Sequence, residues 1–185
     1  MKMFGLSAKE QIAERCARDT YTLLRNDVVR SGLTAKELSK FCLILIRTRR
    51  IEWLSRALRM VPTLPQKHRN KMFDVIIEEC DSVAAGQCIH DIERLSLVVL
   101  RKLVSVIQKA HDSNAADHAI QGAARSQMPE DVLNDLVKVI IASRDTTLAR
   151  RTYRYRKNKN IAPDLRRRLR VIAKRDPCWE TSRRR

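Results

Sequence analysis

The stretch Asp145–Arg175, DTTLARRTYRYRKNKNIAPDLRRRLRVIAKR, decides how the rest of the chain is interpreted. It predicts two helices, about Thr146–Arg156 and Pro163–Lys174, joined by the polar turn KNKN. Asp145 is a suitable N-cap because its carboxylate accepts hydrogen bonds from the free N–H groups of a first helical turn. Pro163 fits the first turn of the second helix, where its missing N–H is not needed. The stretch therefore predicts a helical hairpin.

This hairpin is amphipathic. Leu165, Leu169 and Ile172 fall at i, i+4 and i+7 and form one apolar stripe on the second helix. The opposite side of that helix carries Arg166, Arg167, Arg170 and Lys174. A hairpin with one apolar side needs a neighbour to cover it, so the stretch implies a larger helical assembly.

The composition favours a folded, all-α protein. The chain has 185 residues, and 44% of them are hydrophobic, which is enough for a domain with a core. It has only four glycines and little β-branched alternation, which disfavours all-β folds. Two Trp, three Tyr and three Phe are too few for the aromatic-rich sheets of common RNA-recognition modules.

The net charge of +17 is concentrated near the C-terminal end. Residues 144–185 hold sixteen Lys and Arg against four Asp and Glu, a net charge of +12. Such an excess repels itself unless a polyanion neutralises it, and nucleic acid is the commonest polyanion. An anionic membrane surface and a simply solvated face are the alternatives.

The cysteines and the apolar runs bear on the compartment of the protein and on membrane insertion. The five cysteines are widely spaced and form no CxxC motif, so neither a disulfide framework nor a zinc ribbon is expected, which favours a reducing compartment. The apolar runs 41–46 and 95–100 are far shorter than the ~20 residues of a membrane span. No targeting segment is evident in the first fifteen residues, and no membrane association is expected.

An internal repeat organises the chain. Asp112 lies 33 residues before Asp145, Asp81 lies 31 before Asp112, and Asp176 lies 31 after Asp145. Further steps upstream reach Arg50 and then Asp19. Each of these positions from Asp19 to Asp145 is expected to begin a first helix, and second helices are expected to begin near Thr34, Pro65, Ser96, Pro129 and Pro163. Thr34 opens a capping box that Glu37 completes.

The repeat predicts a right-handed α-solenoid of about five hairpins with a period of about 32 residues. A capping helix over residues 1–18 precedes the array, and a basic tail over 176–185 follows it. The hairpins are expected at 19–49, 50–80, 81–111, 112–144 and 145–175. The alternative is an irregular helical bundle in which the spacing is accidental.

The sequence contains no recognisable catalytic motif. The GxxxxGK[ST], GxGxxG, HExxH and GxSxG motifs are absent, and the glycines are isolated. Cys80, Cys88, His90 and His111 match no structural zinc spacing, so ordinary helix or loop positions are the simpler interpretation. The sequence therefore predicts a non-enzymatic protein with no cofactor and no metal.

Candidate RNA-binding residues cluster in and after the C-terminal hairpin. On its first helix, Arg150, Arg154 and Lys157 fall at i, i+4 and i+7, and arginine presents a planar fork of donors to phosphate. Tyr153 could stack on a base or pack in the core, whereas packing is favoured for Tyr155. The predicted contact residues are Arg150, Arg151, Tyr153, Arg154, Arg156, Lys157, Lys159, Arg166, Arg167, Arg170, Lys174, Arg183, Arg184 and Arg185.

Paired helices with a period of about 32 residues and a basic excess resemble the octotricopeptide and heptatricopeptide RNA-binding repeats of organelles. The segments Asp145–Leu148 and Ile161–Arg166 also resemble HEAT-like and variant leucine-rich repeats. The first resemblance implies an RNA-binding structural subunit of a mitochondrial or other organellar ribosome, or of a similar ribonucleoprotein. RNA, most simply ribosomal RNA, would be one partner, and neighbouring proteins would contact the N-terminal hairpins. The alternatives are a protein interaction scaffold and a HEAT-like DNA-binding protein.

Overall fold

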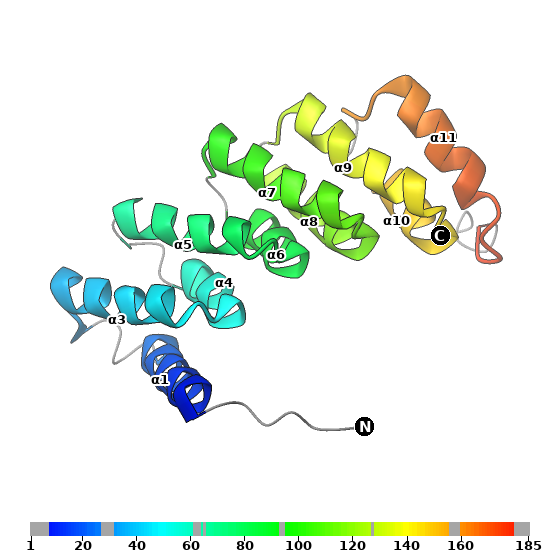
Figure 1. Ribbon diagram of the computed structural model, residues 1–185. Helices are drawn as coiled ribbons and strands as arrows, with labels where there is room; N and C mark the ends of the chain where they lie inside the picture. Colours follow the sequence, from blue (N-terminus) through cyan, green and yellow to red (C-terminus); the bar gives the residue numbers. More distant parts are fainter. Residues whose placement is uncertain are drawn as a thin grey trace. The chain divides into compact units, whose positions relative to one another are not determined.

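All regular structure in the part of the chain that is described is helical (Figure 1). The computed structural model describes residues 8–26, 32–60, 64, 66–92, 95–126, 128–155 and 160–179. The all-α prediction is confirmed for these residues. None of their helices is long and apolar enough to span a bilayer. The chain divides into two compact units, residues 1–79 and 80–185, and each is described by itself.

Unit 1 contains α1 (Ala8–Arg25), α3 (Ala35–Thr48), α4 (Ile51–Met60) and α5 (Gln66–Glu78). Helix α1 packs against α3 and α4, and both α3 and α4 pack against α5. The fully buried side chains of this unit include Leu24, Leu45, Leu54, Leu58, Met72 and Ile76, which come from α1, α3, α4 and α5. Burial of these aliphatic side chains holds the unit together.

The helix start expected at Asp19 is wrong. Helix α1 runs without a break from Ala8 to Arg25, so Asp19 lies inside it and caps nothing. The reason is packing: Ala17, Tyr21 and Leu24 fall at i, i+4 and i+7 and are all buried. One continuous apolar stripe favours one continuous helix over two short ones.

The described residues of unit 2 form six helices in three successive pairs. They are α6 (Ser82–Asp91) with α7 (Leu97–Ala110), α8 (Ser113–Ser126) with α9 (Glu130–Ser143), and α10 (Thr146–Arg154) with α11 (Pro163–Ala173). The first helices contact one another in the order α6, α8, α10, and the second helices in the order α7, α9, α11 (Figure 1). Each pair therefore covers the apolar side of the next.

Capping hydrogen bonds confirm several of the predicted helix starts. The backbone N–H of Thr34 donates to Glu37 Oε2 at 2.9 Å, and that of Glu37 donates back to Thr34 Oγ1 at 3.3 Å, which completes the capping box. Asp81 and Asp145 accept from the N–H groups three residues later, at 2.8 and 2.9 Å. Pro163 lies in the first turn of α11, as expected.

Four left-handed residues mark the junctions between successive pairs. Within the described residues, the non-glycine positions with positive φ all lie between 50° and 57° and are Arg49, Cys80, His111 and Arg144. Each lies directly before one of the repeat marks Arg50, Asp81, Asp112 and Asp145. A left-handed residue ends one helix and turns the chain into the cap of the next. The period seen in the sequence is therefore a period of helix junctions.

Two glycines let α6 and α8 approach each other closely. A Cβ added at Gly122 would lie 2.3 Å from His90 Cα, and one at Gly86 would lie 2.9 Å from the carbonyl oxygen of Ala115. Other small residues of these two helices are buried as well, namely Ala84, Ala85, Ala116 and Ala119. These isolated glycines serve helix packing.

Candidate nucleic-acid interface

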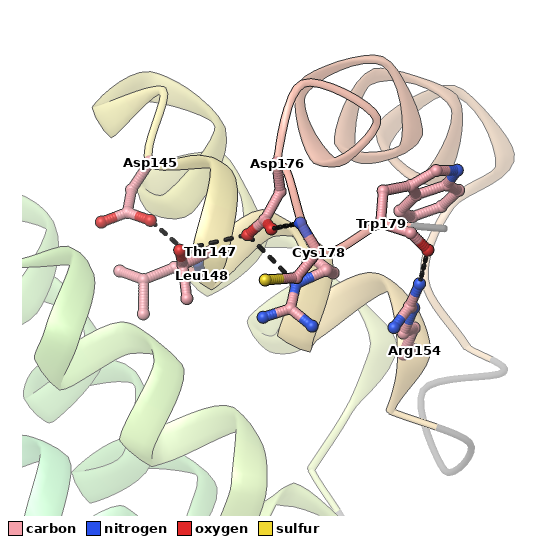
Figure 2. A network of polar contacts seen from close by, with 8 residues as sticks. Asp145, Thr147, Leu148, Arg154, Asp176, Cys178 and Trp179 are labelled. Carbon is pink, nitrogen blue, oxygen red and sulfur yellow. Dashed lines mark hydrogen bonds and ion pairs between the residues drawn. The ribbon is translucent and has the colours of Figure 1, made fainter. Parts of the chain in front are cut away.

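The first turn of α10 holds the segment that follows α11 (Figure 2). The buried carboxylate of Asp176 accepts from Thr147 Oγ1 and from Arg150 Nε, each at 3.1 Å, and from the backbone N–H of Cys178 at 2.7 Å. Burial alone would raise the pKa of Asp176, but these donors outweigh it and lower the pKa below its usual value. Arg150 thus has a structural role in closing the hairpin.

Tyr153 and Arg154 pack against Trp179, which is buried. The Tyr153 and Trp179 ring centroids are 5.6 Å apart, and the guanidinium of Arg154 lies 5.0 Å from the Trp179 ring centroid. Arg154 also donates to the backbone carbonyl of Trp179 (Figure 2). On the other helix, Arg166 lies 5.7 Å from the Tyr153 ring centroid. Tyr153 therefore makes contacts within the hairpin and remains half-buried.

Arg151 and Tyr155 connect α10 to the preceding pair of helices. Arg151 Nη1 donates to Asp117 Oδ2 at 2.9 Å, and the Tyr155 hydroxyl donates to the carbonyl oxygen of Gln121 at 2.6 Å. The expectation that Tyr155 packs within the protein is thus confirmed. The described cations of α10 all take part in contacts within unit 2.

The cations of α11 differ from those of α10. Arg167, Arg168, Arg170, Lys174 and Arg175 are exposed, and none of them has an ion pair among the described residues. Asp164 is the acidic residue of this helix, and it lies in the first turn. Among the described residues of unit 2, cations without an ion pair are therefore most numerous in α11 and in the two residues that follow it.

A groove of about 430 Å³ lies between the end of α9 and α11. Its lining is aliphatic at Ile141, Val171 and Ile172 and cationic at four positions, with no acidic residue; the cations are Arg144, Arg167, Arg168 and Arg175. We call this the arginine groove. Arg144 comes from the left-handed junction after α9, Arg167 and Arg168 come from α11, and Arg175 comes from the turn that follows α11.

The preceding groove, between α7 and α9, contains acidic residues as well as an arginine. It is lined by Arg101, Val104 and Gln108 from α7 and by Asp131, Val132 and Asp135 from α9. Arg101 Nη2 donates to Asp131 Oδ2 at 2.9 Å, so its arginine is neutralised across the groove. The second helices of unit 2 thus form two successive grooves, a neutralised one between α7 and α9 and the arginine groove between α9 and α11. Of these two grooves, the arginine groove is the one suited to binding an anion.

Sequence reasoning found part of this site. Arg167 lines the arginine groove, whereas Arg166 and Arg170 on α11 and Lys174 at its C-cap are not among the lining residues. Arg144, Arg168 and Arg175 were missed, although Arg168 and Arg175 share a helix side at i and i+7. The predictions at Arg156, Lys157, Lys159, Arg183, Arg184 and Arg185 fall outside the described residues.

The histidines and cysteines form no metal centre in the described part of the chain, where no three His, Cys, Asp or Glu side chains converge.

The His90 and His118 rings stack with centroids 4.2 Å apart, and His90 Nδ1 lies 2.7 Å from Asp91 Oδ1. Burial, and then His90, lower the pKa of His118. Burial raises the pKa of the Cys42 thiol to about 11, which keeps it protonated and unreactive.

Comparisons with known proteins give no family for the chain. A scan against protein-family models matches nothing, and searches of characterised proteins and of solved structures likewise return no match. The case for a function therefore rests on the arginine groove and on the charge distribution.

Proposed function

We propose that the protein is a non-catalytic RNA-binding structural protein that contacts RNA phosphates through α11 and the arginine groove. The observation that carries this proposal is the groove itself, in which four arginines and no acidic residue surround one cavity. Guanidinium groups bind phosphate through paired hydrogen bonds, and the energy of such contacts is largely electrostatic. The contacts would give affinity and placement more than sequence discrimination.

The proposal includes a right-handed α-solenoid of about five hairpins as the scaffold. The order of contacts in unit 2 supports the stacking of hairpins, because first helices contact first helices and second helices contact second helices. The left-handed junctions at Arg49, Cys80, His111 and Arg144 support the same repeat across both units. A mitochondrial or other organellar ribosome, or a similar complex, is the proposed setting, and it follows from the resemblance of the repeat.

The salt dependence of binding tests the phosphate contacts. Each phosphate neutralised on single-stranded RNA contributes about 0.7 to the slope of log affinity against log salt. Replacement of Arg167, Arg168 and Arg175 by glutamine should therefore flatten the slope by about two units. The full chain and a 12-nucleotide oligouridylate are suitable reagents, with fluorescence anisotropy as the readout.

A matched variant controls for net charge. Lys36, Lys40 and Lys71 are exposed residues of unit 1, and changing all three to glutamine removes the same charge. This control should leave the slope within about half a unit of the wild-type value, since only long-range charge is lost. Equal slopes for both triple variants would show that the groove makes no phosphate contact.

Nuclease treatment distinguishes this function from a protein scaffold. If RNA holds the protein in its complex, partners that copurify with the full chain should be lost after RNA digestion. A partner set that survives digestion, and that also survives the arginine replacements, would favour the scaffold.

A further inference from the structure

We propose that the arginine groove receives one unpaired nucleotide, with its base against the aliphatic floor and its flanking phosphates on the arginines. This inference rests on the proposed RNA binding and adds that the groove selects single-stranded over double-stranded RNA. It uses a feature that phosphate contact alone leaves unused, the floor formed by Ile141, Val171 and Ile172.

The floor and the arginines around it have different chemistry. Val171 is 55% exposed although it lies between arginines one turn before and one turn after it, at Arg167 and Arg175. Ile141 is buried and closes the groove from the α9 side. A ligand that fits must therefore combine an apolar or polarisable face with negative charge close by. A nucleotide has both, since its base has a flat polarisable face and its phosphate is an anion.

A duplex does not match this arrangement. The bases of a duplex are stacked in its interior, and its outer surface consists of phosphates and sugars. A duplex would therefore leave the aliphatic floor of the groove without a partner. The cavity of about 430 Å³ is also at the small end of the range for small-ligand pockets. An unpaired base can turn out of a single strand and enter such a space, where guanidinium planes can also stack on it.

The arginines are placed to hold the two phosphates that flank one base. Arg144 approaches from the end of α9, whereas Arg167 and Arg168 lie on α11 and Arg175 lies in the turn just after it. A phosphate on each side of the floor could thus be contacted by a different subset of the four arginines. The neutralised groove between α7 and α9 lacks this property, because Arg101 is paired with Asp131 there.

The test compares three RNA probes on the full chain. They are a 12-nucleotide oligouridylate, the same strand with abasic sites throughout, and a 12-base-pair RNA duplex. Electrostatics alone favours the duplex, which has the higher charge density. We expect the reverse, with the single strand binding about tenfold more tightly than the abasic strand and more tightly than the duplex.

A floor variant separates the base contact from the phosphate contacts. Val171→Ser should weaken oligouridylate binding about fivefold, since an aliphatic contact is lost, and should leave the salt slope unchanged. The same change should have no effect on the abasic strand. Val98→Ser on α7, where Val98 is 66% exposed, is the matched control and should leave all three affinities unchanged. Both positions are exposed, and circular dichroism melting checks that each variant is folded.

The outcomes are distinguishable. Equal binding of intact and abasic strands, or no effect of Val171→Ser, with a steep salt slope would overturn the base-binding inference and leave phosphate contact standing. Absence of binding to all three probes would overturn the proposed function as well. Binding to phosphatidylserine vesicles that Val171→Ser weakens, without binding to oligouridylate, would assign the groove to a lipid headgroup and would also overturn the inference.

Discussion

Arg151 on α10 donates to Asp117 on α8 over 2.9 Å, joining a guanidinium that is 58% exposed to a carboxylate that is 5% exposed. Gln121 Nε2 donates to the same carboxylate at 2.9 Å, and Thr152 Oγ1 lies within hydrogen-bonding range of it. A buried carboxylate needs such donors, because its desolvation is costly when they are absent. This contact is therefore expected to contribute to the docking of the last hairpin on the one before it.

Replacing Arg151 by methionine should destabilise the protein by about 1 to 2 kcal/mol, because Asp117 stays buried and loses its charged partner. The exposed pair Arg101 and Asp131 has the same 2.9 Å separation and offers a matched control. Arg101→Met should cost no more than about 0.5 kcal/mol, since both side chains remain in water. Urea unfolding measures both changes, and equal costs would contradict the role of burial.

Gly122→Ala should be among the most damaging single substitutions in unit 2. The added methyl group would lie 2.3 Å from His90 Cα and 2.8 Å from its carbonyl oxygen, and neither backbone atom can rotate away. We expect a loss of about 3 kcal/mol or more, because α6 and α8 must separate. Gly32→Ala is the control, since its Cβ meets nothing within 4 Å. If thermal unfolding of the Gly122 variant matches the wild type, the close packing of α6 and α8 is wrong.

His111→Gly should stabilise the protein or leave it unchanged, although most glycine substitutions destabilise. His111 has a φ of 52° at the end of α7, a conformation that costs a residue with a Cβ about 1 to 2 kcal/mol. Relief of that strain is offset by the greater entropy of glycine in the unfolded chain, which leaves a gain of up to about 1 kcal/mol. Lys102→Gly, at an exposed position inside α7, should instead cost about 1 kcal/mol. Chemical denaturation of the two variants should therefore give changes of opposite sign or clearly different size.

Asp176→Asn should remove a pH-dependent part of the stability of the C-terminal hairpin. The folded pKa of Asp176 lies below its unfolded value near 3.8, so the charged carboxylate stabilises the fold above that pH. This contribution is lost as the pH falls through the folded pKa. The variant should thus be less stable than the wild type at pH 7, and the difference should shrink below pH 3.8.

Tryptophan fluorescence can follow this pH effect at the residue itself. The chain has two tryptophans, and Trp53→Phe leaves Trp179 as the single reporter. In that background, the buried emission of Trp179 should be lost at lower urea in Asp176→Asn than in the parent at pH 7. A difference in urea midpoint that persists unchanged at pH 3 would contradict the ionic role of Asp176.

Local chemistry made much of the fold predictable from sequence. The N-caps at Thr34, Asp81 and Asp145 need only neighbouring residues, and each was identified correctly. Asp19 was misjudged because an aspartate can also lie on the solvent side of a continuous helix. The left-handed junctions were not recognised as such, because arginine, cysteine and histidine stand where glycine is the usual signal.

The candidate site was less predictable because it depends on contacts between distant residues. Arg150 and Arg154 form part of a cation stripe in the sequence. In the fold, Arg150 donates to Asp176, 26 residues away, and Arg154 donates to Trp179, 25 residues away. Arg144 joins the arginine groove only because α9 ends beside α11. Charge counting located the cationic end of the chain, whereas the division of its arginines between structure and binding required the packed helices.

The two-residue junctions also bear on how such a chain can change length. Two residues lie between α7 and α8 and between α9 and α10, whereas the loops within pairs hold five residues in α6–α7, three in α8–α9 and eight in α10–α11. Each residue turns an α-helix by about 100°, so one residue gained or lost at a junction would rotate the following helix off its packing face. Insertions and deletions should therefore be tolerated within a pair, while the array itself can be extended or shortened only by whole pairs of helices.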